Sequence, residues 1–371
     1  MGPSISEDPF TMKFISSGLS HDCLRPWGKI LGLAWLLCMG CRPQEAEVSA
    51  GAQKITSASH PEIRPHYALL QIDDCQGVCD GSGGVAIDEK HFVIVNDETS
   101  ELLIYERSRS GLPKQRLNIR KHLDLKKKEE ADLEAMARVG STFYVIGSHS
   151  RDNEGKKQKE RRAFMGFSLE PEAGLFRLQV EGKPYDDLMS DLLKDPSMAH
   201  LSLESAYRQA GDDPKGLNIE ALCAGANNSL WIGFRGPLID GKALMVQLSN
   251  PQRVCFGTQA RFGGYALLDL GGQSIRGADS LGEDILIIAD DPWKQKGANL
   301  FFWDGKTSTP EPIPMDGLAL LDPEAVFIFP DTQWQILQVL SDDGGRRRGE
   351  KDCGNLDTPS AMGFRSASFA Y

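Results

Sequence analysis

The sequence predicts an all-β fold, namely a β-propeller of about five, or six, four-stranded blades with a short helical insertion. The first observation is a series of apolar runs, separated by Gly, Asp, Asn and Pro, whose length of roughly five to eight residues is typical of short strands. The second is a weak internal repeat, and recurrence at roughly 40–60 residues is typical of propeller blades. The third is the composition, with 40% hydrophobic residues and 38 glycines, which favours a globular, turn-rich chain.

The charge balance and the apolar runs exclude some classes of protein. The 371 residues contain 41 Lys and Arg and 52 Asp and Glu, a net charge of −11. Such an acidic surface repels phosphates, so a nucleic-acid partner is not expected. No apolar run approaches the roughly 20 residues that span a bilayer, so a multi-pass membrane protein is excluded as well.

Residues 1–41 have the features of a bacterial export signal. Lys13, Arg25 and Lys29 precede an apolar stretch at residues 30–39, a pattern typical of a signal peptide. Gly40 and Cys41 follow and resemble a lipobox, which predicts lipidation of Cys41. An ordinary cleaved signal and an uncleaved anchor are the alternatives, and translation starting at Met12 instead of Met1 is also open.

The same segment predicts the location of the protein. We expect it in the bacterial cell envelope, as a periplasmic or outer-membrane lipoprotein that meets the membrane only through its N-terminal lipid. Residues 42–64 are rich in Ala, Ser, Glu and Pro and show no periodicity, which predicts a flexible tether.

Export changes how the cysteines are interpreted. In an oxidising compartment, Cys75 and Cys79 are predicted to form a disulfide that closes a short loop, with a metal half-site as the alternative. Cys223 lies in a strand-like run and is predicted to be buried. With Cys255 and Cys353 the number after Cys41 is five, so at least one thiol is expected to stay free.

Residues 65–371 are predicted to form the propeller domain. Its strand-like runs include residues 84–88, 91–95, 101–105, 142–146, 230–234, 243–248, 284–288 and 335–340. Residues 185–194 and 201–210 carry Leu and Met at helical spacing, which predicts a helical insertion at about 184–212. The C-terminal residues 364–371 are expected to close the ring with a strand near residues 67–70.

The internal repeat points to one end of the blades. Glu134 and Glu220 each precede Ala and stand 13 residues before a glycine, at positions 147 and 233. Glu324 repeats the Glu-Ala pair, Ala278-Asp279 is a weaker copy, and the first unit, which begins at Ser82, has no Glu. The first strand of a blade starts where the second ends, so both sets of residues should meet at one mouth. The expected mouth residues are Asp97, Glu134, Ser148, His149, Arg151, Glu220, Arg235, Asp290, Glu324 and Asp342.

Several of these segments resemble a known bacterial family, domain of unknown function 3616. The similar segments are Asp132-Leu-Glu-Ala-Met, Ile146-Gly-Ser-His-Ser-Arg, Leu217-Asn-Ile-Glu-Ala-Leu, Gly233-Phe-Arg-Gly-Pro, Leu268-Asp-Leu-Gly-Gly and Pro323-Glu-Ala. The resemblance covers residues 65 to 371. It implies a propeller related to phytase-like and esterase-like propellers, and it implies no activity.

Two functions fit the predicted mouth, and whether the protein is an enzyme stays open. The first is a monomeric protein that binds a small-molecule or protein ligand at the mouth. The second is a Ca²⁺-dependent phosphoester or ester hydrolase, with Glu134, Glu220 and Glu324 as metal ligands. His149 would then be the acid or base and Arg235 the phosphate clamp. Crowded carboxylates raise one another's pKa unless a cation neutralises them, and Arg235, Arg151 or Ca²⁺ could do so. The structural alternative is that each Glu accepts backbone N–H bonds from the neighbouring blade and fixes blade spacing.

A basic segment follows His149 directly. Residues 156–162 contain five Lys and Arg residues and are expected to form a solvated loop. Because the loop begins near the predicted mouth, it would also be placed to attract an anionic substrate.

Overall fold

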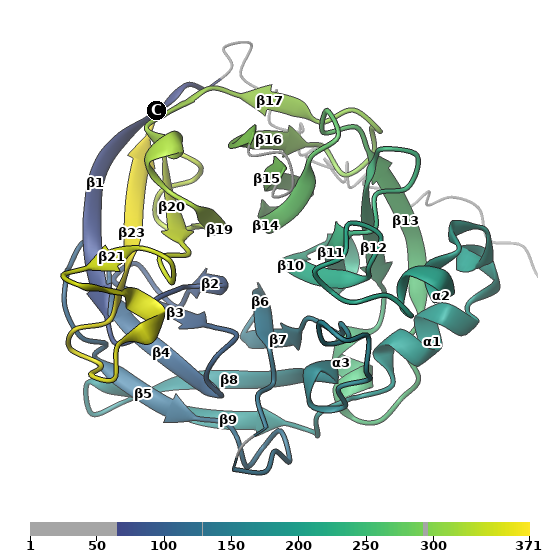
Figure 1. Ribbon diagram of the computed structural model, residues 1–371, viewed down its shortest axis with the longest axis horizontal. Helices are drawn as coiled ribbons and strands as arrows, with labels where there is room; N and C mark the ends of the chain where they lie inside the picture. The colour runs from purple at the N-terminus through teal and green to yellow at the C-terminus, as the bar shows by residue number, and fades with distance from the viewer. Residues whose placement is uncertain (1–64, 128, 292–295) are drawn as a thin grey trace, which may run out of the picture. The chain divides into compact units, whose positions relative to one another are not determined.

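The computed structural model describes residues 65–127, 129–291 and 296–371, and its strands form five blades around a central axis (Figure 1). The predicted propeller is confirmed, with five blades. The predicted signal segment, Cys41 and the tether at 42–64 lie outside the described residues. Within the described residues, no helix has the length and apolarity needed to cross a membrane.

Four blades are four-stranded antiparallel sheets built from consecutive strands, ordered from the axis outward. The first blade consists of β2 (Gly83–Ala86), β3 (His91–Val95), β4 (Glu101–Glu106) and β5 (Gln115–Asn118). The second consists of β6 (Leu133–Val139), β7 (Thr142–Gly147), β8 (Phe164–Glu172) and β9 (Leu175–Glu181). The third consists of β10 (Asn218–Ala224), β11 (Leu230–Gly236), β12 (Ala243–Leu248) and β13 (Phe262–Leu268). The fourth consists of β14 (Ser274–Leu281), β15 (Asp284–Asp291), β16 (Lys296–Trp303) and β17 (Glu311–Ile313).

The fifth blade closes the ring with both ends of the domain. Its strands, from the axis outward, are β19 (Pro323–Ile328), β20 (Ile336–Ser341), β23 (Gly363–Ala370), β1 (Tyr67–Gln76) and the short β18 (Met315–Asp316). The first and last long strands, β1 and β23, pair antiparallel (Figure 1). The predicted closure by the two termini of the domain is therefore correct. Because β1 leads along the chain into β2, this pairing fastens the start of the ring to its last blade.

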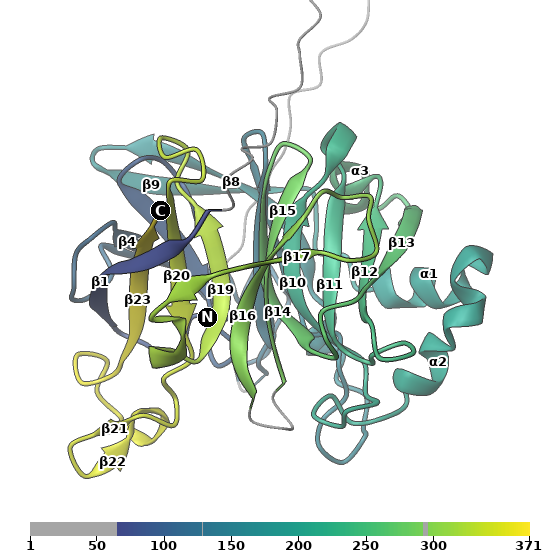
Figure 2. The same ribbon diagram turned by 90° about the horizontal axis from the view of Figure 1, so that it is seen from above.

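The few helices lie in the connections between strands. The insertion between β9 and β10 contains α1 (Leu188–Lys194), the 3₁₀ turn η2 (Pro196–Leu201) and α2 (Leu203–Ala206), all within the predicted range of 184–212. Figure 2 shows α1 and α2 on the outside of the ring, beside β13. The remaining short elements are η1 (Glu160–Arg162), η3 (Ala226–Asn228), α3 (Pro251–Cys255), η4 (Leu318–Leu320), η5 (Cys353–Asn355) and the hairpin β21 (Arg347–Arg348) with β22 (Lys351–Asp352).

The core consists of the layers between neighbouring blades. In β7, Phe143 and Val145 pack with the first blade, whereas Tyr144 and Ile146 pack with the third blade and the insertion. Both faces of the strand are therefore buried, which explains why the inner strands read as continuous apolar runs instead of alternating ones. The insertion joins the same core through Leu188, Met189 and Leu192 of α1.

The predicted Cys75–Cys79 disulfide is wrong. Cys79 is bonded to Cys353, with 5.7 Å between the Cα atoms, and Cys75 is a free, buried thiol in β1. The partner lies 274 residues away because ring closure brings the end of β1 next to the segment that precedes β23. Cys223 and Cys255 are also free and buried, and the prediction of a buried Cys223 is confirmed.

Candidate functional site: an acidic mouth around Arg276

The repeated Glu marks a β-bulge at the start of the innermost strand. The pairing register shifts by one residue at Glu134 in β6, Glu220 in β10 and Glu324 in β19. The fourth blade has the same shift at Arg276 in β14. A bulge leaves one residue unpaired and re-aims its side chain. We call the face where these strands begin and the second strands end the mouth face.

Arg276 is therefore the fourth member of the repeat, in place of the predicted Asp279. The carboxylate of Asp279 instead accepts hydrogen bonds from the backbone N–H groups of Ser280 and Ile328. Burial raises the pKa of Asp279 to about 7. It ties the fourth blade to the fifth and takes no part in the mouth.

Small residues follow every bulge and close the axis. A Cβ atom on Gly277 would lie 2.5 Å from the carbonyl oxygen of Glu324, and one on Gly83 would lie 2.7 Å from the Cα atom of Ala135. Ala221 and Ala325 occupy the same place in the third and fifth blades. The axial cavity between these strands measures only about 10 Å³, roughly the space of a single water. A ligand therefore meets a closed floor at the mouth.

Arg276 links three blades through their carboxylates. One terminal nitrogen bonds Glu220 of the third blade and the other bonds Glu324 of the fifth. Its Nε lies 3.8 Å from Oδ2 of Asp290, within its own blade. Arg276 is 7% exposed and Glu220 6%, so these ion pairs are screened little by solvent.

Glu220 has further donors within its own blade. Nη1 of Arg235 donates to Oε1 of Glu220 at 2.9 Å, and the side-chain amide of Asn218 donates to the same oxygen at 3.0 Å. Arg235 therefore holds a carboxylate of the protein, and it is half-buried. Glu220 and Glu324 therefore link blades through the side chain of Arg276, whereas the predicted backbone N–H bonds to them do not occur among the described residues.

The remaining mouth carboxylates have no such cation. Within the described residues, no ion pair involves the side chain of Asp80, Asp97, Glu134 or Asp342. Burial raises the pKa of Asp97 to about 6, with Asp132 and Glu98 adding repulsion. Burial also raises the pKa of Glu134, and the negative charges of Asp132 and Glu220 add to that shift. This part of the mouth is therefore an unneutralised acidic surface.

Further carboxyl groups at the mouth face also have raised pKa values. Burial raises the pKa of Asp80, and Asp97, Glu324 and Asp342 reinforce the shift. Burial raises the pKa of Asp290 to about 6, against the opposing effect of Arg276. Burial likewise raises the pKa of Glu324, which Arg276 also opposes. The mouth carboxylates thus repel one another, as expected for residues that converge. They are Asp97, Glu134, Glu220, Asp290, Glu324 and Asp342.

The proposed calcium ligands are not arranged as a metal site. Two of them, Glu220 and Glu324, engage Arg276, whose guanidinium lies between them. Across residues 65–127, 129–291 and 296–371, no group of three or more His, Cys, Asp or Glu side chains is placed to hold a metal ion. Calcium binding stays a prediction without a structural observation behind it.

His149 and Ser148 are buried beneath the mouth. His149 is 0% exposed, and no partner reaches either ring nitrogen within the described residues. Burial lowers the pKa of His149 to about 3, and Arg162 lowers it further, so the imidazole is neutral at physiological pH. Its charged neighbours are Arg162 and Asp186, so the structure does not support the predicted acid–base role. Ser148 donates to the carboxylate of Asp132.

Arg151 points away from the glutamates. Its Nε donates to the carbonyl oxygen of Tyr207 at 2.6 Å, and its Nη1 donates to that of Gly155 at 2.9 Å. The first contact ties Arg151 to the helical insertion, and the second ties it to its own loop after β7. Of the neutralising groups expected, Arg235 pairs with Glu220, whereas Arg151 forms no ion pair with a glutamate within the described residues. Arg276, which was not expected, pairs with Glu220 and Glu324.

Comparison with known proteins gives a family. The family model described as "Protein of unknown function (DUF3616)" matches residues 82–165 and 172–316, well over half of the chain. The chain belongs to this family. The DUF3616 match includes the bulged residues Glu134, Glu220 and Arg276 and ends before Glu324. No curated protein matches the chain.

Solved structures resemble the chain only distantly. A glutaminyl cyclase from Myxococcus xanthus is 11% identical, with 83% of this chain and 99% of that chain covered and a TM-score of 0.45. A GH43 β-1,3-galactosidase is 8% identical, with 78% and 90% covered and a TM-score of 0.39. The allergen Mala s 1 from Malassezia sympodialis is 9% identical, with 81% and 96% covered and a TM-score of 0.36. At these TM-scores the resemblances assign neither an activity nor a ligand.

Proposed function

We propose that the protein is an exported, lipid-anchored propeller that binds the cationic end of a small-molecule or protein ligand at its mouth. The observation that carries the proposal is a group of carboxylates that form no ion pair with any described residue, at Asp80, Asp97, Glu134 and Asp342. Crowding of negative charge raises their cost of ionisation, and a bound cation removes that cost. Because the axis is closed, the ligand would present an ammonium or guanidinium group from outside instead of entering a channel.

An organic cation fits the mouth better than calcium. Ca²⁺ takes six to eight oxygen ligands, and two of the three predicted glutamates are already paired with Arg276. An ammonium or guanidinium group needs only two or three acceptors, which carboxylates from two adjacent blades would supply. The Ca²⁺-dependent phosphoester or ester hydrolase is kept as the second outcome of the test below.

The disulfide supports the exported part of the proposal. Disulfides persist mainly in oxidising compartments, and the Cys79–Cys353 bond is consistent with the export signal predicted in residues 1–41. Lipidation of Cys41 would then tether the propeller to a membrane surface. The net charge of −11 continues to disfavour nucleic acid as a partner, and we expect a monomer.

The test is isothermal titration of the purified full chain with spermidine, arginine and, separately, CaCl₂. We expect saturable binding of an organic cation, weakened at least about tenfold by Glu134→Gln, the loss of one charged contact. Glu170→Gln is the matched control, because Glu170 lies in the exposed Arg177 pair on β8.

Two results would change the account. If neither organic cation binds, or if Glu134→Gln binds like the wild type, the mouth is not a cation site. If CaCl₂ alone binds and Glu134→Gln abolishes this, the metal prediction is restored and phosphoester hydrolysis should be assayed next.

A further inference from the structure

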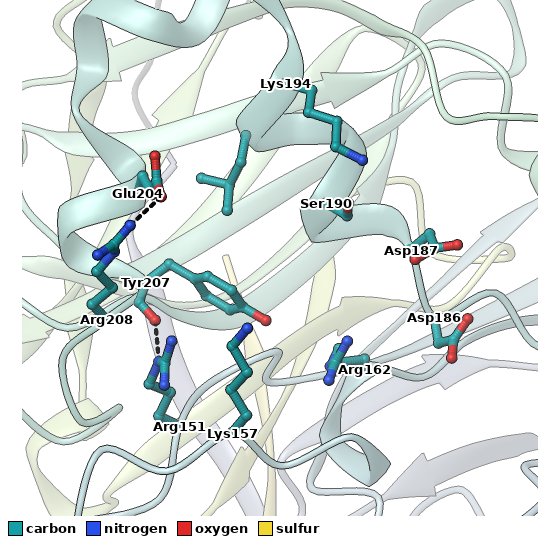
Figure 3. Close-up of a pocket in the computed structure, with 11 residues that line it drawn as sticks. Arg151, Lys157, Arg162, Asp186, Asp187, Ser190, Lys194, Glu204, Tyr207 and Arg208 are labelled. Atoms are coloured by element: carbon teal, nitrogen blue, oxygen red, sulfur yellow. Dashed lines mark hydrogen bonds and ion pairs between the residues drawn. The ribbon is translucent and has the colours of Figure 1, made fainter.

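A separate cavity lies between the helical insertion and the loop after β7. It measures about 710 Å³, within the range of small-molecule sites. Figure 3 shows Arg151, Lys157 and Arg162 along one side and Lys194 of α1 on the opposite side. Tyr207 and Arg208, which follow α2, complete the group that we call the insertion pocket.

The insertion pocket contains cations without carboxylate partners. Within the described residues, no ion pair involves Arg151, Lys157, Arg162 or Lys194. The lining has five cationic and three acidic residues. Glu204 pairs with Arg208, which also lines the pocket. Asp186 lies 3.5 Å from Lys159 outside it, and Asp187 is the third acidic residue. The pocket therefore has a surplus of positive charge inside an acidic protein, which favours an anionic occupant.

Arg151 is held in place before any ligand arrives, whereas Arg162 has a donor to offer. Arg151 is anchored by the carbonyl oxygens of Tyr207 and Gly155, and a β-bridge joins Arg151 to Lys157. Arg162 is the last residue of the 3₁₀ turn η1 and is half-buried, and its Nε is buried with no acceptor within the described residues. A buried donor without an acceptor is costly, so an anion that supplies the acceptor would be favoured.

His149 does not supply a counter-ion for Arg162. The imidazole is buried and neutral beside Arg162, so it provides no negative charge to offset the guanidinium. A counter-ion for Arg162 would therefore bind on the pocket side, which Lys157 and Arg151 also line (Figure 3).

We propose that the insertion pocket binds the phosphate group of a small phosphomonoester. Planar guanidinium groups match phosphate oxygens bidentately, so Arg151 and Arg162 would grip the group, while Lys157 and Lys194 add charge at the rim. Tyr207 and Leu193 would pack against the body of the molecule. This site is independent of the acidic mouth, and no chemical step is assigned to it.

The test is isothermal titration of the full chain with glycerol 3-phosphate and adenosine monophosphate, and flotation with vesicles of phosphatidic acid in phosphatidylcholine. We expect saturable binding of at least one probe, weakened at least tenfold by Arg162→Gln and reduced by salt. Binding of a soluble probe identifies a free phosphomonoester, and binding of the vesicles alone identifies a lipid headgroup. Arg177→Gln, in an exposed ion pair on β9, should bind like the wild type.

Further variants control for a loss of folding and for an effect of the acidic mouth on phosphate binding. If Arg162→Gln unfolds, the double variant Lys157→Ala with Lys194→Ala replaces it, because both lysines are exposed. Glu134→Gln should leave phosphate binding unchanged, which separates this proposal from the proposed function. No saturable binding of any probe at millimolar concentration, or binding unchanged by the pocket variants, would overturn the assignment.

Discussion

At the scale of single residues, Arg276 explains how a ring of glutamates is tolerated at the centre of the fold. Its guanidinium bonds Glu220 and Glu324 from two other blades while lying near Asp290 of its own. A buried charge is stable only when paired, so these residues depend on one another. The Glu-Ala repeat predicted the glutamates from the sequence. It did not predict Arg276, because an arginine at the same bulge position does not match a repeat defined by Glu.

Removing Arg276 should destabilise the fold strongly. Arg276→Met replaces the guanidinium by a shorter, uncharged side chain, which leaves Glu324 without its cation and Glu220 with Arg235 as its cation. Breaking a buried pair on one side typically costs about 3–5 kcal/mol of the free energy of unfolding. Urea denaturation measures this loss, and Arg177→Met, which breaks only an exposed pair, should change the free energy by less than about 1 kcal/mol. Equal effects of the two variants would show that Arg276 does not hold the blades together.

The raised pKa values predict that stability falls as pH rises from about 4 to 7. Asp97 and Asp290, each with a pKa of about 6, keep protons in the folded state that the unfolded chain has already released. The folded state binds more protons in this window, so the free energy of unfolding decreases with pH. Denaturation between pH 4.5 and 8 should show a loss on the order of 1–3 kcal/mol.

Glu134→Gln should reduce that pH dependence. The variant removes a carboxyl whose pKa is raised by burial and by Asp132, so it should be the more stable protein at pH 8 and nearly equal to the wild type at pH 5. Glu170→Gln, on an exposed strand, should leave the slope unchanged. A Glu134→Gln variant that is less stable at pH 8 would show that the Glu134 carboxylate is stabilised by a partner.

At the scale of strands, the bulge and the small residue after it act together to shape the centre of the ring. The bulge turns a charged side chain toward the mouth, and the following Ala or Gly lets five strands converge at the axis. Strand positions were predictable, because each is a short apolar run bounded by turn residues. The bulges were not, because the inner strands are buried on both faces and have no alternating pattern that a one-residue shift would interrupt.

Adding a single methyl group at the axis tests whether the innermost strands need a small residue there. Gly277→Ala would place Cβ 2.5 Å from a backbone oxygen of Glu324, and overpacking of this kind typically costs about 1–3 kcal/mol. Gly297→Ala in β16 is the matched control, because nothing lies within 4 Å of a Cβ there. Thermal unfolding should separate the two variants, and an unchanged midpoint for Gly277→Ala would mean that the inner strands are free to move apart.

At the scale of the whole molecule, ring closure decides which distant residues meet. The pairing of β1 with β23 was predictable, since a propeller must close and the two ends of the domain carry strand patterns. The disulfide was not, because Cys75 and Cys79 are near in sequence while Cys353 approaches only after closure. The bond also fixes the position of Asp80, which follows Cys79 and belongs to the mouth.

Reduction of this disulfide should loosen the closure. Cross-links over long loops typically contribute about 2–4 kcal/mol, so dithiothreitol or Cys353→Ser should lower the free energy of unfolding by that order. Peptide mapping without reduction should recover Cys79 linked to Cys353, and Cys75→Ala should leave this linkage intact. Recovery of a Cys75–Cys79 peptide would instead restore the pairing inferred from spacing.

Cation binding at the mouth is the central claim, and its pH dependence tests it most directly. Spermidine would be titrated into the full chain at pH 5 and at pH 8 by isothermal titration calorimetry. Because a bound cation favours ionised carboxylates, we predict markedly tighter binding at pH 8, lost in Glu134→Gln but kept in Glu170→Gln. Affinity that is equal at the two pH values, or no binding at either, would contradict the account.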